Sequence, residues 1–175
     1  MTSLSLCYPE WTVRDFTLEQ VENREIRAVR HFQFTAWPDH GVPETPDSLL
    51  RFIRTVRGQI PRNSGPSVIH CSAGVGRSGT FMCLDFLLQH LARKENEFID
   101  VFGLVAKMRQ QRCFMVQTEA QYVFIHKAVL DILQGRVSDS NWLLTPSQSS
   151  SGYPSKQEIE HEPEFYDPND KDVEL

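Results

Sequence analysis

The sequence predicts an α/β fold in which short strands alternate with amphipathic helices. Three observations indicate this class. Apolar and polar residues alternate over residues 25–36, a short apolar run ends at His70, and the segments after each of these carry apolar residues at helical spacing. At 175 residues the chain has the length of one domain plus a tail.

Two segments are predicted to be strands. The alternating residues of the first, between Glu25 and Ala36, indicate one or two strands with one buried face. The second, residues 67–70, is a short apolar run preceded by Gly65 and Pro66, which break regular structure.

Four helices are predicted after these strands. The first is capped by Thr45 with Pro46 at its first position, and the second runs from Arg77 to about Leu91. A third covers residues 98–109, and the fourth starts at Thr118. Their inward faces consist of Leu49, Leu50, Phe52, Ile53 and Val56; Phe81, Leu84, Leu87 and Leu88; Phe98, Val101, Phe102, Val105 and Met108; and Tyr122, Ile125, Val129 and Ile132.

Composition is that of a soluble globular protein with an acidic tail. Hydrophobic residues make up 40% of the chain, and no apolar stretch approaches the length of a membrane span. Residues 138–175 hold nine acidic residues and two lysines, a charge of −7, which leaves +2 for residues 1–137 out of the chain's net −5. The slightly basic part suits an anionic substrate. The four cysteines, at 7, 71, 83 and 113, show no paired metal-ligand spacing. A cysteine thiolate of low pKa suits a reducing compartment, where it stays free.

The run His70–Thr80 carries the chemistry. Cys71 and Arg77 are separated by five small residues, so that backbone N–H groups of a tight turn can point at one centre near a helix start. Such a nest binds a phosphate dianion and favours a cysteine thiolate, and the planar guanidinium of Arg77 can hold two phosphate oxygens. The hydroxyl of Ser78 is placed to donate to the sulfur. The competing interpretation, a strand–turn–helix connection rich in Gly and Ser, explains less of the run.

This run resembles the signature loop of the cysteine-dependent protein tyrosine phosphatases, a superfamily that also includes dual-specificity and lipid phosphatases. The resemblance implies a central twisted mixed sheet flanked by helices. Within residues 15–135 the likeness is greatest to receptor-type domains, through Trp37–Pro43 and Gly103–Arg109.

The segment Trp37–Pro43 resembles the mobile acid loop of the tyrosine-specific branch. Expelling a phenolate from phosphorus requires a proton on the leaving oxygen, and Asp39 is the candidate donor. Alone, the segment is better explained as a type I or II turn. Followed by the cysteine loop in the expected order, it favours the acid loop.

The segment Gln117–Gln121 resembles the glutamine motif of tyrosine-specific domains. An amide side chain can orient a water molecule without becoming charged, and the resemblance implies that Gln117 does so with help from Gln121. Thr118 and Gln121 also form a capping box that opens a helix. Both interpretations can hold.

The resemblance implies a phosphatase that hydrolyses phosphotyrosine through a cysteinyl-phosphate. Cys71 attacks phosphorus, Asp39 acts as general acid and then base, Ser78 eases loss of the thiolate, and His70 helps to keep the sulfur ionised. Implied catalytic residues are Cys71, Asp39, Arg77, Ser78, Gln117, Gln121 and His70. Implied substrate contacts are Asp39, Cys71, Ser72, Ala73, Gly74, Val75, Gly76, Arg77 and Gln117. No metal or other cofactor is implied.

The extent of the match predicts an incomplete catalytic domain. Residues 1–14 are expected to be a short, poorly ordered lead, residues 15–136 the carboxyl-terminal half of the domain with its N-terminal part missing, and residues 137–175 a disordered acidic tail. The alternative function is therefore a weak or inactive phosphotyrosine-binding fragment; a dual-specificity phosphatase is disfavoured by the acid loop and the glutamine motif. Expected partners are phosphotyrosine proteins and unknown ligands of the tail, with no nucleic acid and no membrane span. The expected location is cytoplasmic, on the cytosolic side of a membrane if the chain is part of a receptor.

Overall fold

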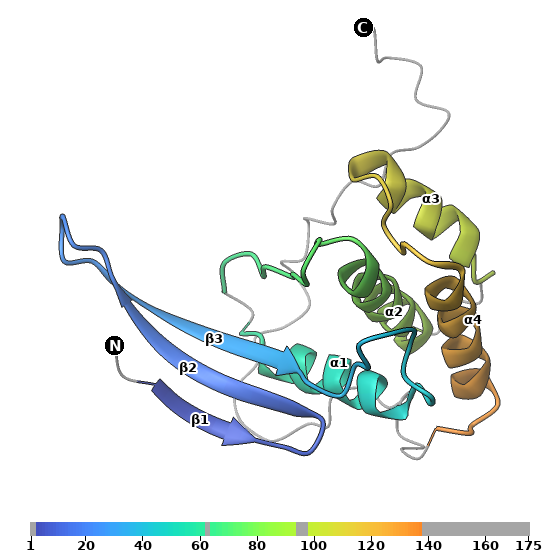
Figure 1. The fold of residues 1–175 in the computed structure, drawn as a ribbon, viewed down its shortest axis with the longest axis horizontal. Coiled ribbons are helices and arrows are strands. Elements are labelled where there is room, and N and C mark those ends of the chain that lie inside the picture. The colour runs from blue at the N-terminus through green and yellow to red at the C-terminus, as the bar shows by residue number, and fades with distance from the viewer. Residues whose placement is uncertain (1–2, 62–63, 94–97, 138–175) are drawn as a thin grey trace, which may run out of the picture. The chain divides into compact units, whose positions relative to one another are not determined.

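The computed structural model describes residues 3–61, 64–93 and 98–137. The chain divides into two units, residues 1–145 and 146–175, and the described residues fall in the first. Their order is three strands followed by four helices (Figure 1). The α/β class is therefore confirmed. The tail prediction, apart from Val137, lies outside the described residues.

The sheet is antiparallel, with strand order β1-β2-β3. Its strands are β1 (Ser3–Cys7), β2 (Trp11–Glu19) and β3 (Ile26–Phe34). Trp11 pairs with Phe34, and both rings pack on Phe52 of α1 (Asp47–Gln59), with centroids 6.0 and 5.2 Å away. The sheet is thus buried at this end, whereas the end at the β2–β3 turn is exposed and extends away from the helices (Figure 1).

The strands differ from the sequence expectation in two places. Residues 3–7 and 11–19 form strands where a poorly ordered lead was expected over residues 1–14. The alternation in β2 is interrupted after Trp11 and Val13 by Asp15, which is largely exposed and pairs with Arg30 across the strands at 2.6 Å.

The predicted strand over residues 67–70 is wrong. Residues 64–70 have no regular secondary structure and are exposed, Val68 by 86%. A run of so few apolar residues has no period of its own, and in the described part of the chain no neighbouring strand pairs with it. The sheet is accordingly antiparallel across the described residues and not mixed.

The four predicted helices are present, but the third begins at Val101, and Phe98 and Phe102, predicted on its inward face, are exposed. The helices are α1, α2 (Gly76–Ala92), α3 (Val101–Gln111) and α4 (Glu119–Leu133). The predicted Thr45 cap is wrong: Pro46 occupies the N-cap of α1, and no side chain caps the helix there. Asp100 caps α3 by accepting from the Gly103 N–H at 2.8 Å.

Helix α2 packs against α1, α3 and α4, so the other helices surround it (Figure 1). The core contains fully buried residues from α1, α2, α4 and the loop before α4, namely Leu49, Leu50, Ile53, Thr80, Cys83, Leu84, Val116 and Ile125. Among the described residues, no helix is long and apolar enough to cross a bilayer.

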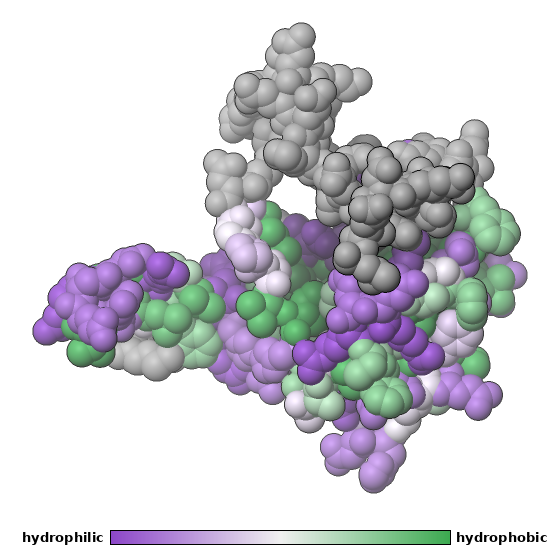
Figure 2. Space-filling view, turned by 90° about the horizontal axis from the view of Figure 1, so that it is seen from above, coloured by the Kyte–Doolittle hydropathy of each residue, from purple (hydrophilic) through white to green (hydrophobic). Residues whose placement is uncertain are grey.

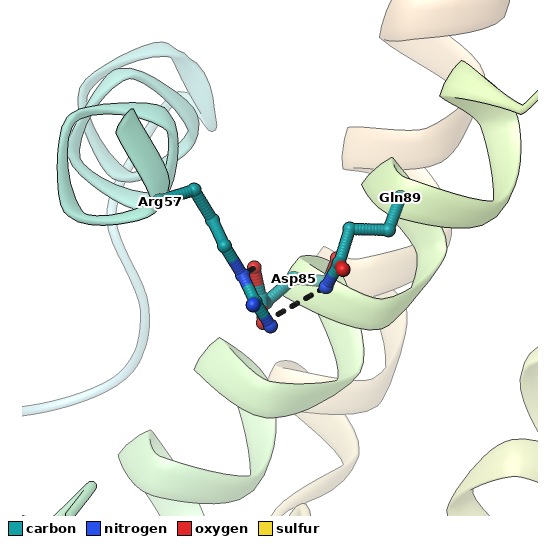
Figure 3. Close-up of polar contacts among 3 residues, drawn as sticks. All are labelled: Arg57, Asp85 and Gln89. Carbon is teal, nitrogen blue, oxygen red and sulfur yellow. Dashed lines mark hydrogen bonds and ion pairs between the residues drawn. The ribbon is translucent and has the colours of Figure 1, made fainter. Parts of the chain in front are cut away.

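An ion pair joins α1 to α2 at the edge of this core. Arg57 Nε donates to the buried carboxylate of Asp85 at 2.6 Å, and Arg57 Nη2 donates to its second oxygen. Gln89 Nε2 lies 3.3 Å from the same carboxylate (Figure 3). The hydrogen bond to Asp85, which outweighs the effect of burial, raises the pKa of Arg57.

The exposed surface mixes charged and apolar side chains. Figure 2 shows apolar groups among the hydrophilic ones both on the exposed end of the hairpin and over the helical part. The large apolar residues with the greatest exposure are Val21 at the β2–β3 turn, Val68, Phe98 and Phe102.

Candidate active site

The loop over residues 71–75 connects the exposed segment before it to the first turn of α2. Cys71 is half-buried, and its Sγ accepts a hydrogen bond from the Gly74 N–H at 3.2 Å. Val75 is the N-cap of α2, with no side-chain cap. The first N–H groups of α2 are therefore not used by a capping side chain, which is the arrangement that binds anions at helix starts.

The sulfur of Cys71 is surrounded by donors. Burial alone would raise its pKa, but hydrogen bonds from the Ser78 hydroxyl and from the N–H groups of Ser78, Gly74 and Val75 lower it from 9.0 to about 7. The Ser78 hydroxyl is buried, but among the described residues it forms no hydrogen bond of ordinary distance and angle, whereas the Gly74 N–H does. The lowered pKa favours the thiolate form near neutral pH.

Two glycines of the helix start are closely approached by other segments. A Cβ at Gly76 would lie 2.9 Å from Gln121 Nε2 and 3.1 Å from Gln117 Oε1. A Cβ at Gly79 would lie 2.4 Å from the backbone nitrogen of Val116. Glycine at these positions lets α2 pack directly against the segment that leads into α4.

The carbonyl oxygen of Val75 links the loop over residues 71–75, called the cradle below, to the segment before α4. It accepts from the N–H groups of Gly79 at 3.0 Å and Val116 at 3.1 Å. Val116 is fully buried and has a φ of 59°, a left-handed conformation that β-branched residues rarely adopt. Arg109 holds the strained segment by donating to the carbonyls of Met115 at 2.9 Å and Val116 at 2.7 Å.

Gln117 follows this segment, and Gln121 lies one turn into α4. The capping box is confirmed: the Thr118 side chain accepts from the Gln121 N–H at 3.2 Å, and Gln121 Oε1 accepts from the N–H groups of Thr118 and Gln117. The oxygen of Gln121 is thus bound to backbone, and its NH₂ group lies beside Gly76. Gln117 is exposed.

The segment over residues 37–44 is held by an internal hydrogen bond and by contacts with α4. Trp37 Nε1 donates to the Gly41 carbonyl at 3.1 Å, and Gly41 has a φ of 79°, which glycine tolerates. The Trp37 ring is buried 6.3 Å from the ring of Phe124. Lys127 donates to the carbonyl of Glu44 at 3.1 Å.

Arg77 connects this loop to the cradle. Its Nη2 donates to the Pro38 carbonyl at 3.0 Å, and its Cζ lies 5.7 Å from the centre of the Trp37 ring. Asp39, the next residue after Pro38, is exposed, and within the described residues its carboxylate makes no hydrogen bond or ion pair.

His70 is placed differently from the sequence expectation. It is exposed, and within the described part of the chain its ring makes no hydrogen bond to the backbone of the cradle; instead it stacks on His31 of β3 with centroids 6.4 Å apart. Burial, followed by the charges of Arg14 and His70, lowers the pKa of His31.

The structure thus gathers most of the predicted residues around the start of α2. Gly74, Val75 and Ser78 surround the Cys71 sulfur. Gln117 and Gln121 lie beside Gly76, and Arg77 contacts the Pro38 carbonyl. The described residues contain no group of three His, Cys, Asp or Glu side chains able to hold a metal ion.

Sequence reasoning missed two arginines near the site. Arg109, assigned to a helix end, holds the segment before Gln117, and Arg112 Nη2 donates to the Ala73 carbonyl at 3.1 Å. The signal was two arginines in a short polar stretch, Arg109–Arg112, shortly before the glutamine motif.

Comparison with known proteins shows the family of the chain. The family model described as protein-tyrosine phosphatase matches residues 4–131. Similar proteins include the receptor-type tyrosine-protein phosphatase eta of Mus musculus, 49% identical over 78% of this chain, and the receptor-type tyrosine-protein phosphatase F of Homo sapiens, 51% identical over 69%. The phosphatidylinositol phosphatase PTPRQ of Homo sapiens is 44% identical over 74%. The matched regions span 11%, 6% and 5% of these relatives.

Proposed function

Because this chain belongs to the protein-tyrosine phosphatase family, we propose that it hydrolyses phosphotyrosine in proteins through a covalent phosphate on Cys71. The observation that carries the proposal is the set of donors around the Cys71 sulfur, which lowers its pKa to about 7 beside the uncapped start of α2. This arrangement supplies a nucleophile and an anion site at one place.

In the first step the Cys71 thiolate attacks phosphorus in line, and the bond between phosphorus and the tyrosine oxygen breaks. Asp39 gives its proton to that oxygen, and tyrosine leaves. Arg77 and the cradle N–H groups stabilise the three equatorial oxygens, where negative charge is spread in the transition state.

In the second step water attacks the phosphocysteine and the S–P bond breaks. Asp39, now a carboxylate, takes a proton from that water, and Gln117 orients it. The position of Gln117 beside Gly76, with its backbone N–H held by Gln121, supports this role. The Ser78 hydroxyl donates to the departing thiolate, and inorganic phosphate is released.

The net charge of +2 over residues 1–137 supports an anionic phosphoprotein substrate. The four free cysteines support the reducing cytosol as the location. Within this proposal Ser72, Ala73 and Gly76 belong to the substrate-facing loop. The receptor-type relatives favour the cytosolic side of a membrane.

Turnover of two aryl phosphates by the full chain tests the proposal. We expect p-nitrophenyl phosphate to be hydrolysed, and Cys71→Ser to remove that activity. Asp39→Asn should slow the hydrolysis of a phosphotyrosine peptide by about 10²-fold or more. It should slow the hydrolysis of p-nitrophenyl phosphate less, because nitrophenol is a more acidic leaving group and depends less on protonation.

Two further substrates and a binding measurement separate the alternatives. Faster turnover of phosphoserine peptide, or of phosphoinositide vesicles, than of phosphotyrosine peptide would replace the proposed substrate class. Tight binding of phosphotyrosine peptide with no turnover would instead support a phosphotyrosine-binding fragment. Loss of both binding and turnover would refute both functions.

A further inference from the structure

One peptide unit of the cradle is held at both ends. The carbonyl oxygen of Ala73 accepts from Arg112 Nη2 at 3.1 Å, and the N–H of the same peptide, which belongs to Gly74, donates to Cys71 Sγ at 3.2 Å. The C=O and N–H of a trans peptide lie in one rigid plane and point in opposite directions. Any group that fixes the direction of the Ala73 oxygen therefore fixes the direction of the Gly74 N–H.

The orientation of this peptide plane has to be fixed by a group outside the loop. Gly74 has a φ of 73°, and glycine adopts positive and negative φ with similar ease. Rotation of the peptide plane would turn the carbonyl oxygen toward the sulfur and remove a donor from the anion site. The chain around Gly74 does little by itself to prevent such a rotation, because glycine lacks the Cβ that would oppose it.

Arg112 is placed to fix the orientation of the Ala73–Gly74 peptide. It directly follows α3, and its backbone N–H donates to the Met108 carbonyl at 3.0 Å, so the base of its side chain is fixed to the helix. Its guanidinium lies against Gly74, where a Cβ would be 3.4 Å from Nη2 and 3.6 Å from Cζ. Among the described residues it forms no ion pair, so its contact with Ala73 does not compete with a carboxylate.

We propose that Arg112 is a positioning residue, which holds the Ala73–Gly74 peptide so that its N–H faces the Cys71 sulfur and the bound phosphate. The guanidinium also draws electron density toward the Ala73 oxygen, which makes the Gly74 N–H a stronger donor. Arg112 acts through this peptide and does not touch the substrate. The inference rests on the proposed role of Cys71 as nucleophile, but its test does not require turnover.

The test measures the ionisation of Cys71 directly. Alkylation of the full chain by iodoacetamide is followed between pH 5 and 10 in a Cys7→Ser/Cys113→Ser background. Site-resolved mass spectrometry separates Cys71 from Cys83, whose buried thiol has a pKa raised to about 12 and serves as an internal control. Iodoacetamide is neutral, so its own approach does not depend on the charge of Arg112.

We expect Arg112→Ala and Arg112→Met to raise the pKa of Cys71 by about one unit, which lowers alkylation near pH 7 roughly fivefold. Arg112→Met keeps the aliphatic stem and so guards against a packing defect. Arg93→Ala is the matched control, because Arg93 follows α2 as Arg112 follows α3, and it should leave the pKa unchanged. An unchanged pKa in a folded Arg112→Met chain would overturn the proposal.

A salt series separates peptide positioning from a plain charge effect. The pKa difference between wild type and Arg112→Met should persist from 0.1 to 1 M KCl, because a hydrogen bond is little affected by screening. A difference that vanishes at 1 M would show that Arg112 acts only as a distant charge. A raised KM with an unchanged thiol pKa would show that it binds substrate instead. Absence of turnover, with the expected pKa shift present, would count against the proposed function and leave this inference supported.

Discussion

Arg77 donates to the carbonyl oxygen of Pro38 at 3.0 Å, and so a residue of the second helix holds the loop that carries Asp39. The same guanidinium lies 5.7 Å from the Trp37 ring. A planar group with several donors can bind a carbonyl, an aromatic face and phosphate oxygens in turn, which an ammonium group cannot reproduce.

We therefore expect Arg77→Lys to lower kcat/KM for p-nitrophenyl phosphate by about 10²-fold or more. Steady-state kinetics on the full chain checks this, with Arg93→Lys as the control at an exposed arginine that follows the same helix. A loss of less than threefold would contradict a role for guanidinium geometry.

The pH dependence follows from Cys71. Because its pKa falls from 9.0 to about 7 on folding, the unfolded chain binds more protons between these values, and the stability that the thiolate contributes rises from pH 7 to pH 9. The difference in unfolding free energy between wild type and Cys71→Ser should increase over this range and be flat below pH 6. Denaturant titrations at several pH values measure it, and a difference independent of pH would show that the thiol is not perturbed.

Gly79 should not tolerate a side chain. A Cβ there would lie 2.4 Å from the backbone nitrogen of Val116, so Gly79→Ala must push α2 away from the segment before α4. We expect a loss of about 1–3 kcal/mol. Gly58→Ala is the matched control, since Gly58 is also helical with nothing within 4 Å, and it should add about 0.5–1 kcal/mol. Chemical denaturation of both variants measures the change in the free energy of unfolding. A Gly79→Ala chain as stable as the wild type would contradict the prediction.

The buried Asp85 should matter more than an exposed aspartate. Asp85→Asn removes the charge that Arg57 contacts from α1, and we expect a loss of about 1–3 kcal/mol because the partner stays partly buried. Asp15→Asn breaks the exposed pair with Arg30 and should change stability little. Equal effects in thermal melts would contradict this ranking.

Arg109 should influence the second chemical step. Arg109→Met removes both donors that hold the Met115 and Val116 carbonyls, and we expect a loss of about 2 kcal/mol in stability. Because Gln117 directly follows Val116, hydrolysis of the phosphocysteine should slow more than its formation. Rapid-mixing experiments should then show a larger burst of nitrophenol before the steady state. A uniform slowing of both phases would contradict this.

The helices were predictable because their apolar residues recur at helical spacing and because the Thr118 capping box is visible in the sequence. The strand β2 was not, since the alternation that starts at Trp11 and Val13 is interrupted by the exposed Asp15, whose partner Arg30 is far away in sequence. The short run at 67–70 could not be placed either, because strand formation depends on a neighbour that local sequence does not specify.

The chemistry-bearing residues of the candidate site were recognisable because the cradle is one continuous stretch. The residues that hold its backbone were not, since Arg112 and Arg109 act on carbonyl oxygens, which every residue has. The left-handed Val116 was equally hidden, because valine carries no sequence signal for that conformation.

The oxygen of Val75, shared between Gly79 and Val116, has an evolutionary consequence. A substitution that moves the Val75 carbonyl also moves Val116, the residue just before Gln117. In the proposed mechanism such a substitution would affect both the attack by sulfur and the attack by water, so natural variants should alter the two half-reactions together and seldom one alone.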